Sequence, residues 1–160
     1  MQGLLSTDAI AGDHDLRSRA EALFEAWNRR AYEEVAEFLS PDVVLTDHIR
    51  GTTVKGPDGY MDRFKPMMDA FPDMAGEISS LSVNGNVVAQ ETLWRGTHSA
   101  PLVLPSMRVI EPTNQQVTVH IAVFLTFDQT GSVTDIRTYG NPTESMLDLK
   151  VTSSLAGGTG

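Results

Sequence analysis

Two hairpin signals in the second half of the chain limit its fold more than any other feature. Asn84-Gly85 separates two runs of alternating polar and apolar residues within 77–98, and Asn-Gly is the pair best suited to a two-residue hairpin turn. A second alternating pair within 116–139 turns near Gly131. We therefore expect the second half of the chain to form a twisted antiparallel sheet.

The first half of the chain is helical in pattern. Apolar residues recur at helical spacing in 13–30, 32–39 and 57–71, with a strand expected at 42–48. Pro66 lies inside the third stretch and should kink or split that helix. Helices followed by a sheet are typical of an α+β fold. We expect the sheet to curl around the helices as a cone whose open end admits a small apolar molecule.

Composition and charge limit the domain organisation, the partners and the cofactors that we expect. The 160 residues predict one domain over 1–150 and a flexible tail over 151–160, which is rich in Ser, Gly and Thr. The net charge of −9 repels phosphate groups, so we expect no nucleic-acid or membrane partner. The chain has no cysteine, four isolated histidines and no nucleotide-binding fingerprint, so we expect neither metal nor cofactor. Without a secretion signal, a cytoplasmic location is expected.

Several local strings, in order and spacing, resemble the SnoaL-like polyketide cyclases of the ketosteroid isomerase-like, or nuclear transport factor two-like, superfamily. The resemblance covers about 15–149 and implies the cone-shaped α+β fold. It also implies a cofactor-independent cyclase or isomerase of a polyketide-like intermediate in antibiotic or other secondary metabolism, and a homodimer. The strings are FLSPDVVLTD (38–47), GPDGYMDRF (56–64), AFPD (70–73), RGTHSAPL (95–102) and DIRTYGN (135–141).

The acid and base that the resemblance implies are not retained in this sequence. Aligned on Gly131, the family's Asp falls at Thr138 and its His at Phe124, or at Val123 if the hairpin loop is one residue longer. A threonine takes up no proton near neutral pH, so any chemistry must use other residues. We expect Thr138 and Phe124 to contact the substrate instead.

His120 is one candidate for the missing acid or base. It shares a strand face with Phe124, because side chains alternate along a strand. The other face of 117–127 is entirely apolar, so we expect His120 to line the cavity and the apolar face to contact a helix or a second subunit. A histidine in a cavity titrates near physiological pH. The alternative is a histidine that bonds locally or lies in a dimer interface.

Asp47 and His48 are further catalytic candidates at the end of the first strand. Adjacent residues point to opposite faces, so at most one of them faces the cavity. Asp47 shares its face with Val43 and Leu45, which favours Asp47. A carboxylate in an apolar cavity is suited to act as a general base. The alternative is a surface or turn-capping aspartate.

Aromatic and thioether side chains are expected to form the apolar wall of the cavity, since methionine adapts to irregular ligands. Asn141, just beyond the last strand, is a candidate polar contact. The proline-containing stretch 99–115 is too long for a tight turn and is expected to be functional or mobile. The residues expected to form the apolar wall are Trp94, Tyr60, Phe64, Met68 and Met107. The alternative is that they belong to the hydrophobic core and contact no ligand.

These observations favour a cyclase or isomerase that moves a proton through Asp47 and His120 and folds its substrate in the cavity. One alternative is a small-molecule-binding or accessory protein without catalysis. Another is an epoxide hydrolase in which Asp47 and either Asn141 or Gln90 hold a water. Whether a titratable group faces the cavity distinguishes the two catalytic interpretations from the binding-only one.

Overall fold

The computed structural model describes residues 2–145, with side-chain environments for 15–142 and 144; the predicted tail lies outside this range. The expected succession of helices and strands is confirmed in the described residues. Their elements are α1 (Gln2–Asn28), α2 (Tyr32–Glu37), β1 (Leu39–Asp47), β2 (Thr52–Lys55), α3 (Gly56–Ala70), β3 (Ala75–Asn84), β4 (Val87–Thr97), β5 (Leu102–Val103), β6 (Val109–Ile110), β7 (Gln116–Phe127), β8 (Val133–Gly140) and α4 (Pro142–Ser145).

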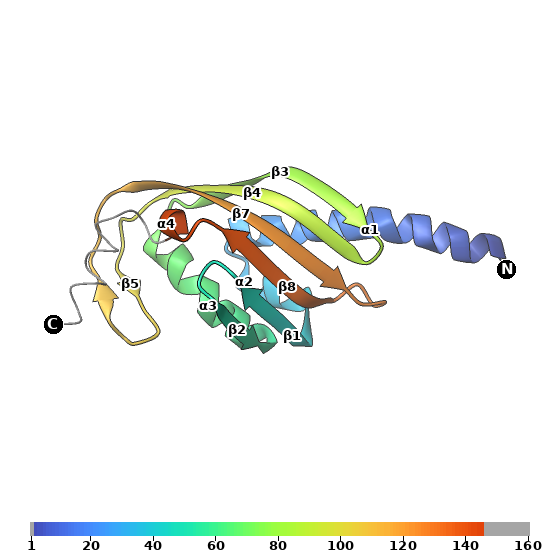
Figure 1. Ribbon diagram of the computed structural model, residues 1–160, viewed down its shortest axis with the longest axis horizontal. Coiled ribbons are helices and arrows are strands. Elements are labelled where there is room, and N and C mark those ends of the chain that lie inside the picture. Colours follow the sequence, from blue (N-terminus) through green and yellow to red (C-terminus); the bar gives the residue numbers. More distant parts are fainter. Residues whose placement is uncertain (1, 146–160) are drawn as a thin grey trace.

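Six strands form one sheet in the order β2-β1-β8-β7-β4-β3. Neighbouring strands are antiparallel, as expected, except that β1 and β8 run parallel. The sheet curves over α3 and α1 (Figure 1). This arrangement is the predicted α+β fold, and the parallel pair is the one departure from the predicted antiparallel pattern.

The core lies between the concave face of the sheet and the two long helices. Leu23, at 3% exposed, and Trp27, at 7%, reach it from α1. Tyr60 and Met68 reach it from α3, and the apolar face of β7 forms much of the sheet side. Burial of these side chains is the main favourable term for the two-layer packing.

Pro66 lies within α3 without splitting it, contrary to one of the two outcomes expected from sequence. The helix extends from Gly56 to Ala70. A proline inside a helix loses one backbone hydrogen bond, and here Tyr60 and Met68 on either side of it are both buried. Tertiary packing therefore outweighs the local preference.

The stretch 99–115 is partly structured, because β5 and β6 pair within it as a short hairpin. His98 anchors its base: the ring is buried and its Nδ1 lies 3.0 Å from Oγ1 of Thr113. The ring also stacks on Phe71, with centroids 5.3 Å apart. In residues 2–145, no helix is both long and apolar enough to cross a bilayer.

Candidate active site

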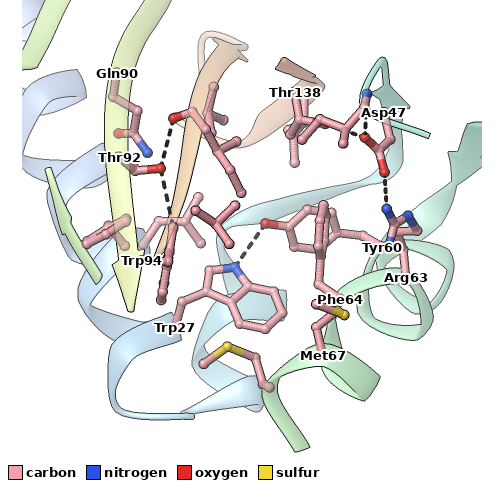
Figure 2. Close-up of a pocket in the computed structure, with 18 of the residues that line it drawn as sticks. Trp27, Asp47, Tyr60, Arg63, Phe64, Met67, Gln90, Thr92, Trp94 and Thr138 are labelled. Carbon is pink, nitrogen blue, oxygen red and sulfur yellow. Dashed lines mark hydrogen bonds and ion pairs between the residues drawn. The ribbon is translucent and has the colours of Figure 1, made fainter. Parts of the chain in front are cut away.

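A cavity of about 150 Å³ lies between the sheet and helices α1 and α3. Its wall is mostly apolar, with polar groups gathered at two places on opposite sides (Figure 2). The lining residues are Leu23, Phe24 and Trp27 of α1, Tyr60, Arg63, Phe64, Met67 and Met68 of α3, Gln90, Thr92 and Trp94 of β4, Val119, Ile121, Val123 and Leu125 of β7, Ile136 and Thr138 of β8, and Asp47, Ile49, Arg50 and Met74.

Asp47 is the centre of the first polar group in the cavity wall. Its carboxylate is 1% exposed and forms an ion pair with Arg63 through Oδ2. Oδ1 accepts hydrogen bonds from the Thr138 hydroxyl and from the Ile49 backbone N–H, each at 3.0 Å. The parallel pairing of β1 with β8 places Asp47 beside Thr138, which explains why both face the cavity. Three donors therefore fix the orientation of one carboxylate.

Arg50 adds a second guanidinium to the cavity wall. Burial, and to a lesser degree the nearby charge of Arg63, lowers the pKa of Arg50 to about 10, and Asp47 opposes this shift. The group is therefore still cationic at neutral pH. Its Nη2 lies 3.6 Å from Sδ of Met67, another lining residue. Arg50 lies in the turn after β1, and Arg63 lies in α3.

An aromatic cluster lies beside this polar group. The indole N–H of Trp27 donates to the hydroxyl oxygen of Tyr60 at 2.9 Å, and the Tyr60 and Phe64 rings are 5.1 Å apart. Burial raises the pKa of Tyr60, so its phenol stays protonated at physiological pH. Since the oxygen is the acceptor in the bond from Trp27, the phenol proton is left to serve as a donor.

The second polar group in the cavity wall lies on β4. Thr92 donates to the Ile121 carbonyl at 2.9 Å and accepts from the Trp94 indole N–H at 3.2 Å. Gln90 is 7% exposed and its Oε1 has no hydrogen-bond partner. Trp94 lies flat against β3 because its cross-strand partner is Gly76, where an added Cβ would come within 2.7 Å of the indole.

The structure brings seven of the residues proposed from sequence to the cavity wall. These are Asp47, Tyr60, Phe64, Met68, Gln90, Trp94 and Thr138. Asp47 faces inward, on the side of the strand that its shared face with Val43 and Leu45 predicts. The titratable group whose position separates the catalytic from the binding-only interpretation therefore does face the cavity.

The prediction for His120 and Phe124 is wrong, because β7 presents its other face to the cavity. Val119, Ile121, Val123 and Leu125 line the wall, whereas the His120 side chain is 67% exposed and its Nδ1 lies 3.3 Å from the Glu144 carboxylate. Phe124 packs under Arg137 on the outer face. The apolar face, which was expected to contact a helix or a second subunit, lines the cavity opposite the chain's own helices α1 and α3.

His48, Met107 and Asn141 also lie away from the cavity. His48 is exposed and stacks on Tyr139, with ring centroids 4.5 Å apart. Met107 is 77% exposed between β5 and β6, and Asn141 is exposed just after β8. Alternation explains His48, since its neighbour Asp47 takes the inward position. Among the described residues, no three His, Asp or Glu side chains gather as a metal site would require.

Sequence reasoning missed Arg63, Arg50 and Trp27 as members of the site. Arg63 had a detectable signal: it lies three residues after Tyr60 and next to Phe64, so a charged residue occupies the apolar face of a predicted helix. A charge at such a position indicates a buried partner. Arg50 carried no comparable signal, because it lies in a turn with no regular period.

Comparison with known proteins identifies the family. The family model described as a SnoaL-like domain matches residues 20–136. The chain belongs to the SnoaL-like family. No curated protein matches the chain.

Solved structures share the SnoaL-like fold at low sequence identity. AclR of Streptomyces galilaeus, described as "a putative hydroxylase", is 20% identical with a TM-score of 0.73, over 88% of this chain and 98% of that one. A "putative SnoaL-like polyketide cyclase" from Jannaschia sp. is 18% identical with a TM-score of 0.72, over 84% and 90%. IdmH of Streptomyces antibioticus, "a putative polyketide cyclase", is 20% identical with a TM-score of 0.67, over 86% and 98%.

Proposed function

We propose that this protein is a cofactor-independent cyclase or isomerase that removes a proton from the carbon next to a carbonyl group of a small, polyketide-like molecule. One observation carries the proposal. A carboxylate has about four lone-pair sites, and the Asp47 carboxylate uses three of them for Thr138, Ile49 and Arg63. The fourth, on Oδ2, is left for a proton at the wall of an apolar cavity.

The position of Asp47 supports this role. The resemblance to SnoaL-like cyclases puts the base at residue 138, where this chain has Thr138. Asp47 is the residue beside Thr138 on the neighbouring strand, at a strand spacing of about 4.8 Å. A carboxylate is therefore present in the region where the family implies one, and Thr138 orients it by donating a hydrogen bond.

The proton transfer balances without any other reactant. The C–H bond breaks, its proton passes to Oδ2 of Asp47, and its electron pair moves to the carbonyl oxygen as an enolate. Arg63 holds the carboxylate in position, and the Tyr60 phenol donates to the developing oxyanion. In ring closure, the enolate carbon attacks a second carbonyl of the same molecule, and the alkoxide that forms takes the proton from Asp47. In isomerisation, a carbon of the enolate system takes that proton instead. Either outcome returns Asp47 to its carboxylate form.

Exchange of α-protons for deuterium tests the proposal with a probe small enough for the cavity. Acetophenone in D₂O is expected to lose its methyl proton signal faster with the protein than without it. Asp47→Asn should slow this exchange at least about 100-fold, the contribution of a general base. Tyr60→Phe should slow it by a smaller factor. The readout is the ¹H NMR intensity of the methyl group over time.

The matched control is Asp62→Asn, which removes an exposed carboxylate next to Arg63 on α3 and should leave the exchange rate unchanged. Equal rates for the wild type and Asp47→Asn would refute the role of Asp47. Binding of the ketone without any exchange would favour the small-molecule-binding alternative.

Epoxide hydrolysis has less support. That reaction needs a water held jointly by Asp47 and an amide. Gln90 lies across the cavity from Asp47 (Figure 2), with β8 and β7 between their strands, and Asn141 lies outside the cavity. Neither amide is placed to share a water with Asp47.

A further inference from the structure

The side-chain amide of Gln90 is a buried polar group that the proposed proton transfer does not use. The residue is 7% exposed, lines the cavity, and its Oε1 has no hydrogen-bond partner. Buried side-chain oxygens nearly always have a partner, so each exception requires an explanation. A ligand that enters the cavity is one source of the missing partner.

The neighbours of Gln90 cannot supply that partner. Its cross-strand neighbours are Leu81 on β3 and Val123 on β7, which have no polar side-chain atoms. Thr92, two residues along on the same face, already donates to the Ile121 carbonyl and accepts from Trp94. On this face of β4, the hydroxyl proton of Thr92 and the indole N–H of Trp94 are therefore both committed, and neither is left for Gln90.

The polar groups on the far side of the cavity are also committed to one another. Asp47 is bound by Arg63 and Thr138, and its strand is three positions from β4 in the sheet, or about 14 Å at about 4.8 Å per strand. The wall between them is apolar. The cavity therefore suits an apolar body with one polar group near Asp47 and another, separate one near Gln90.

The Gln90 side chain has no hydrogen bond from either end of its amide among the described residues. We propose that this amide forms a hydrogen bond with a hydroxyl group of the ligand, and that the natural substrate carries such a hydroxyl on a ring. A hydroxyl is favoured over an amine or a carboxylate, because the wall around Gln90 offers no counter-charge. The inference rests on the proposed function in taking this cavity as the substrate site, and it does not depend on Asp47 acting as a base.

Phenol and toluene form a matched pair of probes, because they have the same number of heavy atoms and differ in one hydroxyl. A cavity of about 150 Å³ is large enough for one benzene ring. In a wall without a polar partner, toluene binds more tightly, since phenol loses its hydrogen bonds to water on entry. We expect the wild type to bind phenol at least as tightly as toluene.

Gln90→Met keeps the length of the side chain and removes its amide. We expect it to shift the ratio of the phenol and toluene dissociation constants about 10-fold toward toluene, as measured by NMR titration. Gln115→Met is the control, because the Oε1 of Gln115 is also buried without a partner but Gln115 is not a lining residue. This control should leave the ratio unchanged.

Several results would overturn the proposal. They are a wild type that prefers toluene, a ratio unchanged in Gln90→Met, an equal shift in Gln115→Met, and a preference for phenol lost in Asp47→Asn but kept in Gln90→Met. If Gln90→Met does not fold, the side-chain amide signals of Gln90 in the wild type decide the question. They should move further with phenol than with toluene, because only phenol adds a hydrogen bond to the effect of the ring; an equal response to both refutes the assignment.

This test is independent of the α-proton exchange experiment. Wild-type exchange at the uncatalysed rate, together with the expected shift in Gln90→Met, would refute the proposed reaction and leave the role of Gln90 intact. Normal exchange with an unchanged ratio would do the opposite.

Discussion

Asp47 is held by donors from three parts of the chain: Thr138 on β8, Arg63 on α3 and the Ile49 N–H just after β1. Each donor restricts the carboxylate in a different direction, so its free lone pair has one orientation. A proton acceptor that is already oriented needs little rearrangement during the reaction. Removing Arg63 would leave a buried charge without its partner, which is a costly change.

His98 makes the stability of the fold depend on pH. It is completely buried, and burial lowers its pKa in the folded state. Below about pH 6.5, the unfolded chain takes up a proton on this residue that the folded chain resists. The stability that His98 contributes is therefore present above about pH 6.5 and falls as the pH decreases toward the folded-state pKa.

The measurement is urea unfolding of the wild type and His98→Gln at about pH 7.5 and about pH 5.5. We expect the wild type's advantage in unfolding free energy to shrink at the lower pH. The other histidines are shared by both proteins and cancel in the difference. An advantage that stays constant or grows at low pH would contradict the account.

At the residue scale, the sequence was enough to predict that Asp47 faces the cavity. It was not enough to predict which side chains bind Asp47 there. Strand alternation with Val43 and Leu45 was enough to place Asp47 toward the cavity. The pairing of Asp47 with Arg63 and Thr138 depends on how β1, α3 and β8 come together. That arrangement is tertiary, so no local pattern reveals it.

At the scale of elements, Arg30 fastens the end of α3 to the end of α1. Its guanidinium donates to the backbone carbonyls of Phe71 at 2.7 Å and of Met68 at 3.2 Å, with a longer bond of 3.4 Å to Met74. Carbonyls at the end of a helix lack partners within the helix. Since Met68 and Met74 line the cavity, this clamp also sets the position of one of its walls.

Arg30→Met is expected to lower the free energy of unfolding by about 1.5–3 kcal/mol, the range for hydrogen bonds from a charged group. The neighbouring Arg29→Met is the control. Arg29 pairs with Glu34 on the surface, with 55% of its side chain exposed, and such pairs contribute about 0–1 kcal/mol. Urea denaturation of both variants measures the difference. A loss for Arg30→Met no larger than for Arg29→Met would refute the clamp.

The elements themselves were predictable, but the inward face of β7 was not. Its alternation predicted a strand with two unlike faces, and the structure has that strand at Gln116–Phe127. The face with His120 was taken as the cavity wall because it carried polar groups. In this fold the cavity wall is itself apolar, so the apolar face lines both core and cavity. Hydrophobicity alone does not distinguish these two locations.

At the scale of the whole molecule, the sheet forms one layer over α1 and α3 (Figure 1), and the cavity lies between these two layers. The order of elements in the sequence was enough to predict this α+β architecture. The size of the cavity depends on how the helices, which carry Trp27 and Tyr60, pack against the sheet, which carries Trp94. This packing is a property of the assembled fold. The central claim is that this cavity binds a small apolar molecule and that Asp47 acts on it there.

Competition between toluene and acetophenone tests that claim most directly. Toluene fills the cavity but has no acidic proton next to a carbonyl. We predict that it raises the acetophenone concentration needed for half-maximal deuterium exchange and leaves the maximal rate unchanged. Exchange that continues at the same rate while toluene saturates the cavity would show that the chemistry occurs elsewhere and would contradict the account.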